Sequence, residues 1–598
     1  MTFTSGTAAA PFSIPVNDSV TYQQMDGMGV SLTESSAWLL FTKLTAAQRQ
    51  AAMQQLFDPA AGIGISFLRQ PMGASDFVLS RYTFDDVPAG ESDPDLTNFS
   101  IDHDRTYIIP ALQQALTINP KIKIMASPWS PPAWMKASDS LIGGSLLPTS
   151  YTPLANYFVR FVQAYQAEGI PIYAISIQNE PASPINDYPA MPMQDSEQAS
   201  FLGQNLGPAL AAAGISSKVM VFDNSMHSDF AITVLSDPRA GPAAAGTAMH
   251  CYAGDPSAGT TVHDAFPNKD VWLTECSRLT DPGTPSGFVL GQPNADVIVP
   301  MLRNYAKSFV LWNAVLDQNS GPHTGGCTTC LGLLKIDDSV SPATVSPVAD
   351  YYLVGQFSKY TRPGAYQVRS DDGNTGGVLP VAFRNPDGSI VLVAYNNTAD
   401  NVSFDVPWSG KSFNYTQPAG AVTTFVWSPA TLPAVAISMA PSGLLLSPGA
   451  TGNIALTFDP VNGANTQVAL ACSGAPIGAA CSFTPSSLSI SGSTQATASL
   501  KLTTTAPANR IATHSRSRGS VALLAGMALF VVGIFVAGKR MRSAALLMLV
   551  VMLGCGGGTS APPLKSTTPT PAGTYTLTIT ATPSTGAATI LTIPLKVE

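Results

Sequence analysis

The sequence predicts an α/β protein whose main domain is a closed barrel of eight parallel strands ringed by helices, with β-domains after it. Three observations support this prediction. Short apolar runs alternate with segments of helical periodicity between residues 26 and 350. Polar residues stand where the apolar runs end, and short alternating strands replace the pattern after residue 350. The alternation of the first region is typical of βαβ units that build a parallel sheet.

Eight apolar runs can be counted in this first region. They are residues 27–32, 65–71, 122–127, 172–178, 218–222, 247–252, 271–274 and 309–316. Helix candidates lie between them, at residues 45–57, 107–118 and 154–167, and the last shows apolar side chains at helical spacing. Eight strands with intervening helices in roughly 325 residues fit a (β/α)8, or TIM, barrel with insertions.

The pattern divides the chain into three predicted domains. The barrel occupies residues 26–350. Residues 351–429 alternate like an antiparallel β-domain, which the strand candidate at residues 12–25 joins. Residues 434–598 again favour strands and predict an immunoglobulin-like β-domain, interrupted by an apolar insertion at residues 521–555.

The insertion begins with an apolar run at residues 521–538, which just reaches bilayer length. Basic residues at 539, 540 and 542 and a shorter apolar run ending at Cys555 follow. Three interpretations stay open: membrane insertion or contact through residues 521–555, a buried insertion, and lipid attachment at Cys555, which ends a lipoprotein-like stretch.

Composition and charge narrow the class of partner and the location. The formal net charge is -8 and only 11% of residues are charged, which argues against a nucleic-acid partner. The abundance of Gly and Pro, 49 of each, favours an extracellular or cell-surface protein, with membrane anchoring as an open alternative. Residues 1–15 show no basic start followed by an apolar run, so no signal peptide is visible.

Seven cysteines are compatible with three pairs and one odd thiol in an oxidising compartment. Cys327 and Cys330 form a CxxC segment, for which a local disulfide, free thiols and metal binding are all considered. No second CxxC or His pair completes a zinc site with them.

Two glutamates stand at the ends of the fourth and seventh runs. Glu180 ends the segment 177–180, and Glu275 ends the segment 272–275. Strand ends four and seven face each other across a barrel mouth, so both side chains can flank one bond. Retaining glycoside hydrolysis needs an acid at the leaving oxygen and a carboxylate at the anomeric carbon, about 5 Å apart. We therefore predict a retaining β-glycosidase with Glu180 as acid/base and Glu275 as nucleophile.

Other polar and aromatic residues also fall at strand ends, where barrel enzymes carry their chemistry. The amide of an Asn before the acid can hydrogen-bond a sugar 2-hydroxyl, an Arg can order the carboxylates, and aromatic rings can stack on sugar faces. Core packing is the alternative for each ring, and a scaffold role is the alternative for the histidine. The predicted substrate-binding residues at these positions are Arg69, Trp129, Asn179, His250, Tyr252 and Trp312.

Several motifs carry a resemblance to a known family. The most specific are Asp-Gly-Met-Gly at 26–29, Leu-Thr-Glu-Ser-Ser-Ala at 32–37, Arg69 with Met-Gly-Ala-Ser-Asp-Phe at 72–77, Ser-Pro-Trp-Ser-Pro-Pro-Ala-Trp-Met-Lys at 127–136, Gln-Asn-Glu-Pro at 178–181, His-Cys-Tyr at 250–252, Leu-Thr-Glu at 273–275, Leu-Trp-Asn at 311–313, and Gly-Gln-Phe-Ser-Lys at 355–359 with Arg-Pro-Gly-Ala at 362–365. From about Asp26 to Trp427 the chain thus resembles glycoside hydrolase family 30, which includes glucosylceramidases and endo-β-1,6-glucanases.

The resemblance implies a double-displacement mechanism, no metal or organic cofactor, a carbohydrate or glycolipid substrate, and a side β-sandwich packed on the barrel. It carries sugar-binding roles onto Glu34, Trp129, Asn179 and Trp312. Two positions depart from the family pattern. Glu34 stands where glucosylceramidases have Asp, and Cys251 replaces an aromatic residue between His250 and Tyr252. We note that Cys251 and Cys276 can bond between neighbouring strands.

Three functions are compared on this basis. A β-glucosidase resembling glucosylceramidase, with a role in sphingolipid metabolism, is preferred, and an endo-β-1,6-glucanase is the alternative within the enzyme class. A non-catalytic carbohydrate-binding surface protein is the alternative outside it. The presence of both carboxylates argues against the non-catalytic protein.

Overall fold

The computed structural model describes residues 4–5, 10–277, 294–370, 373–428, 434–461, 466–491, 494–507, 568–584 and 588–598. The chain forms two compact units, Met1–Ala430 and Thr431–Glu598. The predicted insertion at residues 521–555, with Cys555, lies outside the described residues. Among the helices that are described, none combines the length and the apolar character needed to cross a membrane.

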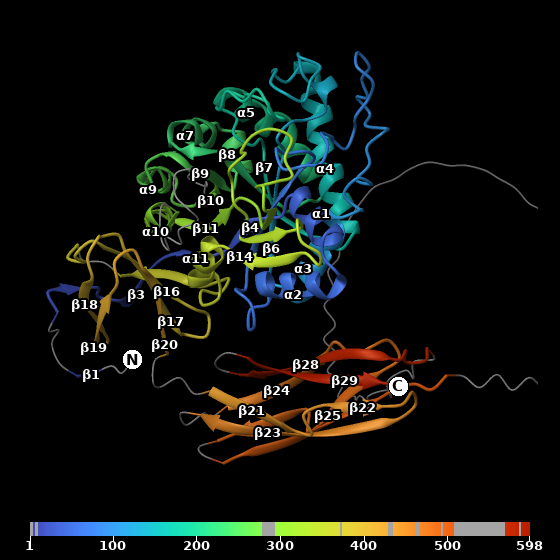
Figure 1. Cartoon of the computed structure of the whole chain (residues 1–598), viewed down its shortest axis with the longest axis vertical. Coiled ribbons are helices and arrows are strands. Elements are labelled where there is room, and N and C mark those ends of the chain that lie inside the picture. Colours follow the sequence, from blue (N-terminus) through green and yellow to red (C-terminus); the bar gives the residue numbers. More distant parts are fainter. Residues whose placement is uncertain are drawn as a thin grey trace, which may run out of the picture. The chain divides into compact units, whose positions relative to one another are not determined.

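Eight parallel strands close into a barrel in the first unit, which confirms the predicted fold class (Figure 1). In barrel order they begin with β4 and end with β11, and each overlaps one predicted apolar run. The strands are β4 (Gly27–Ser31), β5 (Phe67–Pro71), β6 (Lys123–Ser127), β7 (Ile172–Ser176), β8 (Lys218–Met226), β9 (Gly246–Gly254), β10 (Asp270–Cys276) and β11 (Ala306–Leu311).

The interior of the barrel is a packed layer of side chains. Seven of the eight strands each contribute one fully buried residue to a single cluster. Filling of this kind is what makes a barrel of eight strands a core rather than a channel, and it leaves the chemistry to the rim. The cluster consists of Phe67, Met125, Ala174, Met220, Ala248, Trp272 and Val310.

The helices of the first unit pack their apolar faces against the outside of the strands. Predicted helix 45–57 is α2 (Ala46–Phe57), where Thr45 and Gln48 form a capping box that satisfies free amide groups at the helix start. Predicted helices 107–118 and 154–167 are α3 and α4. The remaining bounds are α1 (Glu34–Thr42), α3 (Ile108–Ile118), α4 (Tyr151–Ala167), α5 (Asp195–Phe201), α6 (Gly207–Ala212), α7 (Asp229–Ser236), α8 (Ala240–Ala243), α9 (Ser257–Ala265), α10 (Asn294–Arg303) and α11 (Ala349–Ser358).

The eighth strand is shorter at its carboxyl end than the predicted run 309–316. Asn313 adopts a left-handed backbone, with φ at 69°, which ends the barrel strand after Leu311. The chain then starts a separate small sheet of β12 (Val315–Asp317), β13 (Leu334–Asp337) and β14 (Thr344–Pro347). Trp312 therefore lies in the break between the two sheets.

The side β-sandwich is built from both ends of the first unit, and the early strands lie beside later ones in Figure 1. One sheet has the order β1-β19-β18-β2 and the other β20-β17-β16-β15-β3. Helix α11 buries Leu353, Val354 and Phe357 in a hydrophobic cluster that contains side chains of both the barrel and the side sandwich. The strands are β1 (Thr4–Ser5), β2 (Phe12–Ser13), β3 (Asn17–Gln24), β15 (Tyr366–Arg369), β16 (Val378–Arg384), β17 (Ile390–Asn396), β18 (Val402–Trp408), β19 (Lys411–Gln417) and β20 (Val422–Trp427).

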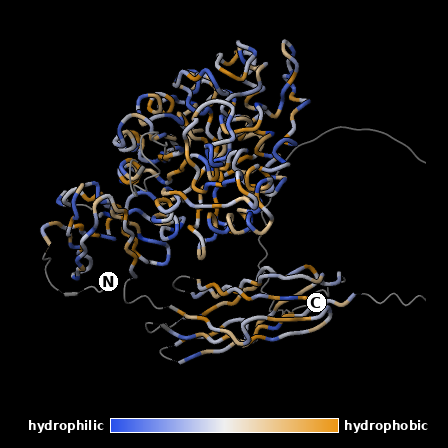
Figure 2. Tube along the Cα trace, viewed as in Figure 1, coloured by the Kyte–Doolittle hydropathy of each residue, from blue (hydrophilic) through white to orange (hydrophobic). Residues whose placement is uncertain are grey.

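The second unit is a sandwich of two sheets with the orders β21-β23-β27-β25 and β22-β29-β28-β24-β26. Hydrophobic and hydrophilic residues alternate along its strands (Figure 2), because one face of each sheet packs on the other. A disulfide joins Cys472 to Cys481. The strands are β21 (Ala434–Ala440), β22 (Leu444–Leu446), β23 (Thr451–Val461), β24 (Thr466–Ser473), β25 (Ala480–Thr484), β26 (Ser487–Ile490), β27 (Ala496–Thr503), β28 (Gly573–Pro583) and β29 (Thr589–Val597).

Candidate active site

The carboxyl ends of the barrel strands bring most of the predicted site residues together. Arg69 belongs to β5, Asn179 and Glu180 follow β7, His250 and Tyr252 belong to β9, and Glu275 belongs to β10. Parallel strands end on the same rim, so residues up to about 200 positions apart in the chain become neighbours.

The two glutamates face each other at short range. One carboxylate oxygen of Glu180, one of Glu275 and a ring nitrogen of His250 all lie within 4.8 Å of one another. Glu180 has a left-handed backbone, with φ at 47°, and its amide donates to the carbonyl of Asp223 at 2.9 Å. Non-glycine residues rarely adopt that conformation, and it concentrates at functional sites. The separation of the carboxylates is that of a retaining pair.

Each carboxylate oxygen of Glu275 accepts a hydrogen bond from a different direction. Arg69 donates from Nη1 to Oε2, and the hydroxyl of Tyr252 donates to Oε1 at 2.8 Å. Burial disfavours the charge of Arg69, but Asp223 and Glu275 outweigh that effect and raise the pKa of the guanidinium. Arg69 is thus a permanent cation that orients the Glu275 carboxylate.

Asp223 is the buried hub beneath these groups. It accepts hydrogen bonds from Arg69 at 2.9 Å, Ser127 at 2.9 Å and Thr274 at 2.6 Å, and it lies 3.1 Å from Nε2 of His250. Burial alone would raise the pKa of this carboxyl. The charge of Arg69 and the hydrogen bonds from His250 and Thr274 outweigh burial and hold the pKa well below its usual range. Asp223 is therefore an anion that fixes both cations of the site.

His250 links the hub to the first glutamate. Its Nε2 faces Asp223, and its Nδ1 lies 3.2 Å from Oε1 of Glu180. Burial disfavours the imidazolium, but the charge of Glu275 and the hydrogen bonds with Asp223 and Glu180 raise the pKa of His250 to about 9. At neutral pH both ring nitrogens of His250 therefore carry protons and donate.

Glu180, His250 and Glu275 also satisfy the spacing of a three-ligand metal site. A histidine binds a metal through an unprotonated nitrogen, whereas the raised pKa of His250 keeps both nitrogens protonated at neutral pH. Both oxygens of Glu275 already accept from Arg69 and Tyr252. The donor set fits acid–base chemistry better than metal binding, and the absence of a cofactor stays a prediction.

The carboxyl of Asp76 lies close enough to Glu180 and Glu275 for their charges to change its pKa. Burial first, and then the charges of Glu275 and Glu180, raise the pKa of Asp76 to about 8, although backbone amides, including that of Cys327, partly oppose the shift. Asp76 is 6% exposed and neutral at pH 7. A neutral carboxyl can donate a hydrogen bond to a sugar hydroxyl as well as accept one.

The predicted aromatic residues Trp129 and Trp312 form one wall beside the cluster. Their rings are stacked, with centroids 5.1 Å apart, and the Arg69 guanidinium carbon lies 4.8 Å and 5.7 Å from them. Phe77 packs edge-on to Trp312. The two tryptophans are only 2% and 3% exposed, so most of each ring packs against protein and a small part is open to a ligand.

Glu34 lies at the start of α1 and is engaged away from the two catalytic candidates. Its Oε1 lies 2.7 Å from Nε2 of His103, and its Oε2 accepts from the amide of Leu79 at 2.9 Å. The ring of His103 in turn stacks on Tyr82. The contacts described for Glu34 thus anchor a loop, and its sugar-binding role stays a prediction.

Two disulfides border the site. Cys251–Cys276 joins β9 to β10 next to His250, Tyr252 and Glu275. Cys327–Cys330 closes a small loop in which the backbone amide of Cys327 donates a hydrogen bond to Asp76. A local disulfide is one of the interpretations predicted for this CxxC segment. Both bridges therefore constrain segments that carry side chains of the cluster.

A closed (β/α)8 barrel with two facing carboxylates on its rim defines a class of enzyme, the retaining glycoside hydrolases. The family model for the glycosyl hydrolase family 30 TIM-barrel domain matches residues 25–359, and that for the family 30 beta sandwich domain matches residues 364–425. The chain belongs to glycoside hydrolase family 30, whose members hydrolyse with retention.

Known relatives include enzymes of two kinds. The chain is 33% identical to an endo-1,6-β-D-glucanase of Aspergillus fumigatus over 432 residues, which cover 68% of this chain and 85% of the relative. It is 28% identical to the lysosomal acid glucosylceramidase of Mus musculus over 432 residues, 68% of this chain and 81% of the relative. A solved endo-β1,6-glucanase structure matches with a TM-score of 0.65 and 32% identity, covering 71% of this chain and 95% of that chain.

The sequence reasoning missed two acidic residues of the cluster. Asp223 directly follows the fifth apolar run at 218–222, so the same strand-end argument that selected Glu180 would have found it. Asp76 lies within the family-like stretch 72–77 but was assigned no role. Its proximity to the glutamates follows from a loop after β5 rather than from a strand end.

Proposed function

We propose that Glu180 is the general acid/base and Glu275 the nucleophile of this enzyme, and that its substrate is a β-1,6-linked glucan. The observation that carries the roles is the distance of at most 4.8 Å between carboxylate oxygens of Glu180 and Glu275. This separation suits direct attack by one carboxylate and leaves no room for a water between them.

In the first step Glu275 attacks the anomeric carbon of the bound sugar while Glu180 gives its proton to the glycosidic oxygen. The bond between that carbon and oxygen breaks, the aglycone leaves as an alcohol, and a glycosyl ester of Glu275 remains. Arg69 and Tyr252 support this role of Glu275, since their two hydrogen bonds fix the direction of the carboxylate.

In the second step Glu180 accepts a proton from a water molecule, whose oxygen attacks the same carbon and releases Glu275. Two inversions give net retention. His250, held by Asp223, contacts Glu180 and is placed to keep its carboxyl oriented through both steps. The charges of Arg69 and His250 balance those of Asp223 and Glu275, so the site is electrically neutral when Glu180 carries its proton.

The choice of a β-1,6-glucan rests on the relatives. The endo-1,6-β-D-glucanase of Aspergillus fumigatus is 33% identical, and the lysosomal acid glucosylceramidase of Mus musculus is 28% identical over an equal length. The higher identity favours the endo-β-1,6-glucanase, which was the alternative in the sequence analysis. We keep the glucosylceramidase-like enzyme as the second candidate because of the 28% identical relative.

Hydrolysis of two substrates separates these candidates. The test measures kcat/KM of the full chain on pustulan, a β-1,6-glucan, and on glucosylceramide in detergent micelles, with Glu275→Gln as the inactive control. We expect pustulan to be cleaved to oligomers at a rate at least tenfold above that on the lipid. Rapid release of ceramide with an intact glucan would overturn the proposal in favour of the second candidate.

We also infer an extracellular or cell-surface location, because three disulfides lie among the described residues and such bonds persist in oxidising compartments. Peptide mapping without reduction, on protein isolated from its native cells, should recover the three pairs. Free thiols at those six positions would contradict the inference.

A further inference from the structure

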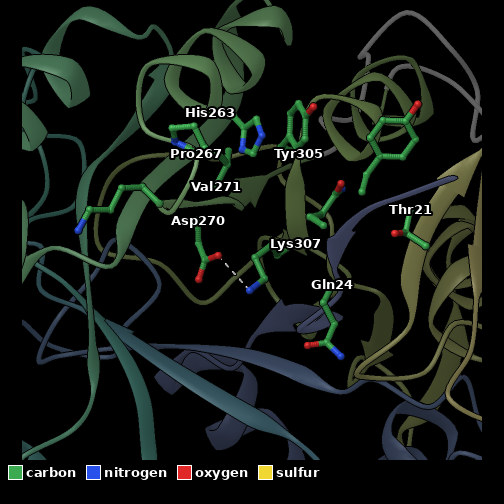
Figure 3. A pocket seen from close by; sticks show the side chains of 11 residues that line it. Thr21, Gln24, His263, Pro267, Asp270, Val271, Tyr305 and Lys307 are labelled. Carbon is green, nitrogen blue, oxygen red and sulfur yellow. Dashed lines mark hydrogen bonds and ion pairs between the residues drawn. The ribbon is translucent and has the colours of Figure 1, made fainter.

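A pocket lies at the opposite end of the barrel from the catalytic rim. It has a volume of about 370 Å3 and is lined by the starts of β10 and β11 and by strand β3 of the side sandwich. Figure 3 shows Tyr305 and His263 beside each other, with Asp270 and Lys307 joined by an ion pair and Thr21 and Gln24 on β3. The pocket therefore joins the two domains of the first unit.

Aromatic side chains form part of its wall. The rings of His263 and Tyr305 are stacked, with centroids 3.6 Å apart and planes at 14°. Tyr22 meets Tyr305 edge-on at 6.3 Å and is 37% exposed. Tyr22 is thus an exposed aromatic ring with a hydroxyl at its tip, which combines an apolar surface with a polar group as sugar-binding surfaces do.

The backbone of Tyr305 is strained for a residue with a side chain. Its φ is 70°, two residues after α10 ends at Arg303. Glycine is the usual residue at such a left-handed helix end, because a side chain is disfavoured there. Tyr305 nevertheless adopts this backbone conformation, and its ring faces the pocket. Backbone strain of this kind is typical of ligand-binding positions.

The charges around the pocket are matched within the protein. Lys307 pairs with Asp270 at 3.1 Å and lies 4.0 Å from Asp26. Lys269 donates to two backbone carbonyls at 2.6 Å, and burial lowers its pKa. A pocket whose cations already have partners favours a neutral polar ligand over an anion.

We propose that this pocket binds a neutral glucopyranose unit of a β-glucan chain, as a second, non-catalytic site on the same enzyme. The choice of a β-glucan rests on the proposed function. Tyr305 and Tyr22 supply the packing surface, and Thr21 and Gln24 supply polar groups for the sugar hydroxyls. A long polymer can occupy the pocket and the active site of one chain together, which strengthens its overall binding.

The test measures retardation by pustulan in native affinity electrophoresis, in a Glu275→Gln background that prevents hydrolysis. Tyr305→Gly removes the ring and places glycine at a left-handed position that it favours, and the melting temperature of each variant is measured to verify that it folds. Tyr305→Phe keeps the ring, and Tyr352→Ala removes an exposed tyrosine elsewhere. We expect Tyr305→Gly to weaken pustulan binding about tenfold, while the other two variants bind like the Glu275→Gln parent.

A Tyr305→Gly variant that is equally retarded by pustulan would overturn the second site. So would a loss of binding that Tyr352→Ala shares. The proposed function fails in a different way: a chain that binds pustulan through Tyr305 but does not cleave it would overturn the catalytic proposal and leave the pocket in place.

Discussion

The hydroxyl of Tyr252 donates a hydrogen bond of 2.8 Å to Oε1 of Glu275, across two neighbouring strands of the barrel. Tyr252 is 46% exposed as a residue, yet its hydroxyl reaches inward to the carboxylate. The bond leaves the carboxylate with a defined orientation before any sugar arrives. Pre-set orientation of a nucleophile is a large part of what an active site contributes to the rate.

Removal of that hydroxyl should slow the reaction without weakening substrate binding. We expect Tyr252→Phe to lower kcat by about 10- to 100-fold, because a hydrogen bond to a charged group is lost. Steady-state kinetics on an aryl β-glucoside measure the effect, with little change expected in KM. Tyr352→Phe, an exposed tyrosine on α11, is the matched control and should behave like the wild type. An unchanged kcat in Tyr252→Phe would show that the bond does not orient the nucleophile.

Loss of the buried anion Asp223 should destabilise the whole first unit. Asp223→Asn leaves Arg69 and His250 buried without their shared counter-charge, which costs about 3–5 kcal/mol. Urea unfolding followed by tryptophan fluorescence measures the change. Asp229→Asn on an exposed turn of α7 is the control and should cost below about 0.5 kcal/mol. Equal stabilities for the two variants would contradict the hub role of Asp223.

The stability of the enzyme should fall on the alkaline side because of His250. Its pKa is raised to about 9 in the folded protein, compared with an ordinary value of 6.5. A raised pKa contributes stability that is complete below pH 6.5 and is lost as pH rises through 9. The full contribution corresponds to roughly 3 kcal/mol. Unfolding free energies of wild type and His250→Gln between pH 6 and 10 should therefore converge as the pH rises, and parallel curves would refute the explanation.

The disulfide Cys251–Cys276 should support activity as well as stability. Replacing both cysteines by alanine frees the strands that carry Tyr252 and Glu275, so we expect a lower kcat together with a loss of about 3 kcal/mol in unfolding free energy. The matched pair Cys472→Ala with Cys481→Ala lies in the second unit and should leave kcat unaltered. The prediction fails if both double variants keep the kcat of the wild type.

The barrel could be predicted from the sequence because each buried parallel strand is a continuous apolar run, and eight such runs can be counted. Strand-end position predicted that Glu180 and Glu275 lie near each other, as they do, while their catalytic roles remain a proposal. What could not be predicted depends on loops. Asp76 reaches the site through the turn after β5. Glu34, whose sugar-binding role rests on the family resemblance, uses both oxygens on His103 and Leu79.

The exposure of side chains could not be predicted from the sequence either. Trp129 and Trp312 are predicted to stack on sugars, with core packing as the alternative, and in the structure they stack on each other and are 2% and 3% exposed. The residues around the pocket at Tyr305 form no sequence motif, because they come from three separate segments. The packing of β3 against the barrel brings these segments together. Contacts between distant segments depend on the folded backbone rather than on local pattern.

Azide rescue with product stereochemistry tests the assignment of the two glutamates most directly. Glu275→Gly and Glu180→Gly are each assayed on an aryl β-glucoside with sodium azide, and the sugar azide is identified by NMR. We predict the α-glucosyl azide from Glu275→Gly, because azide replaces the missing nucleophile in a single inversion, and the β-glucosyl azide from Glu180→Gly. The opposite pairing of variants and anomers, or rescue of neither variant, would contradict the account.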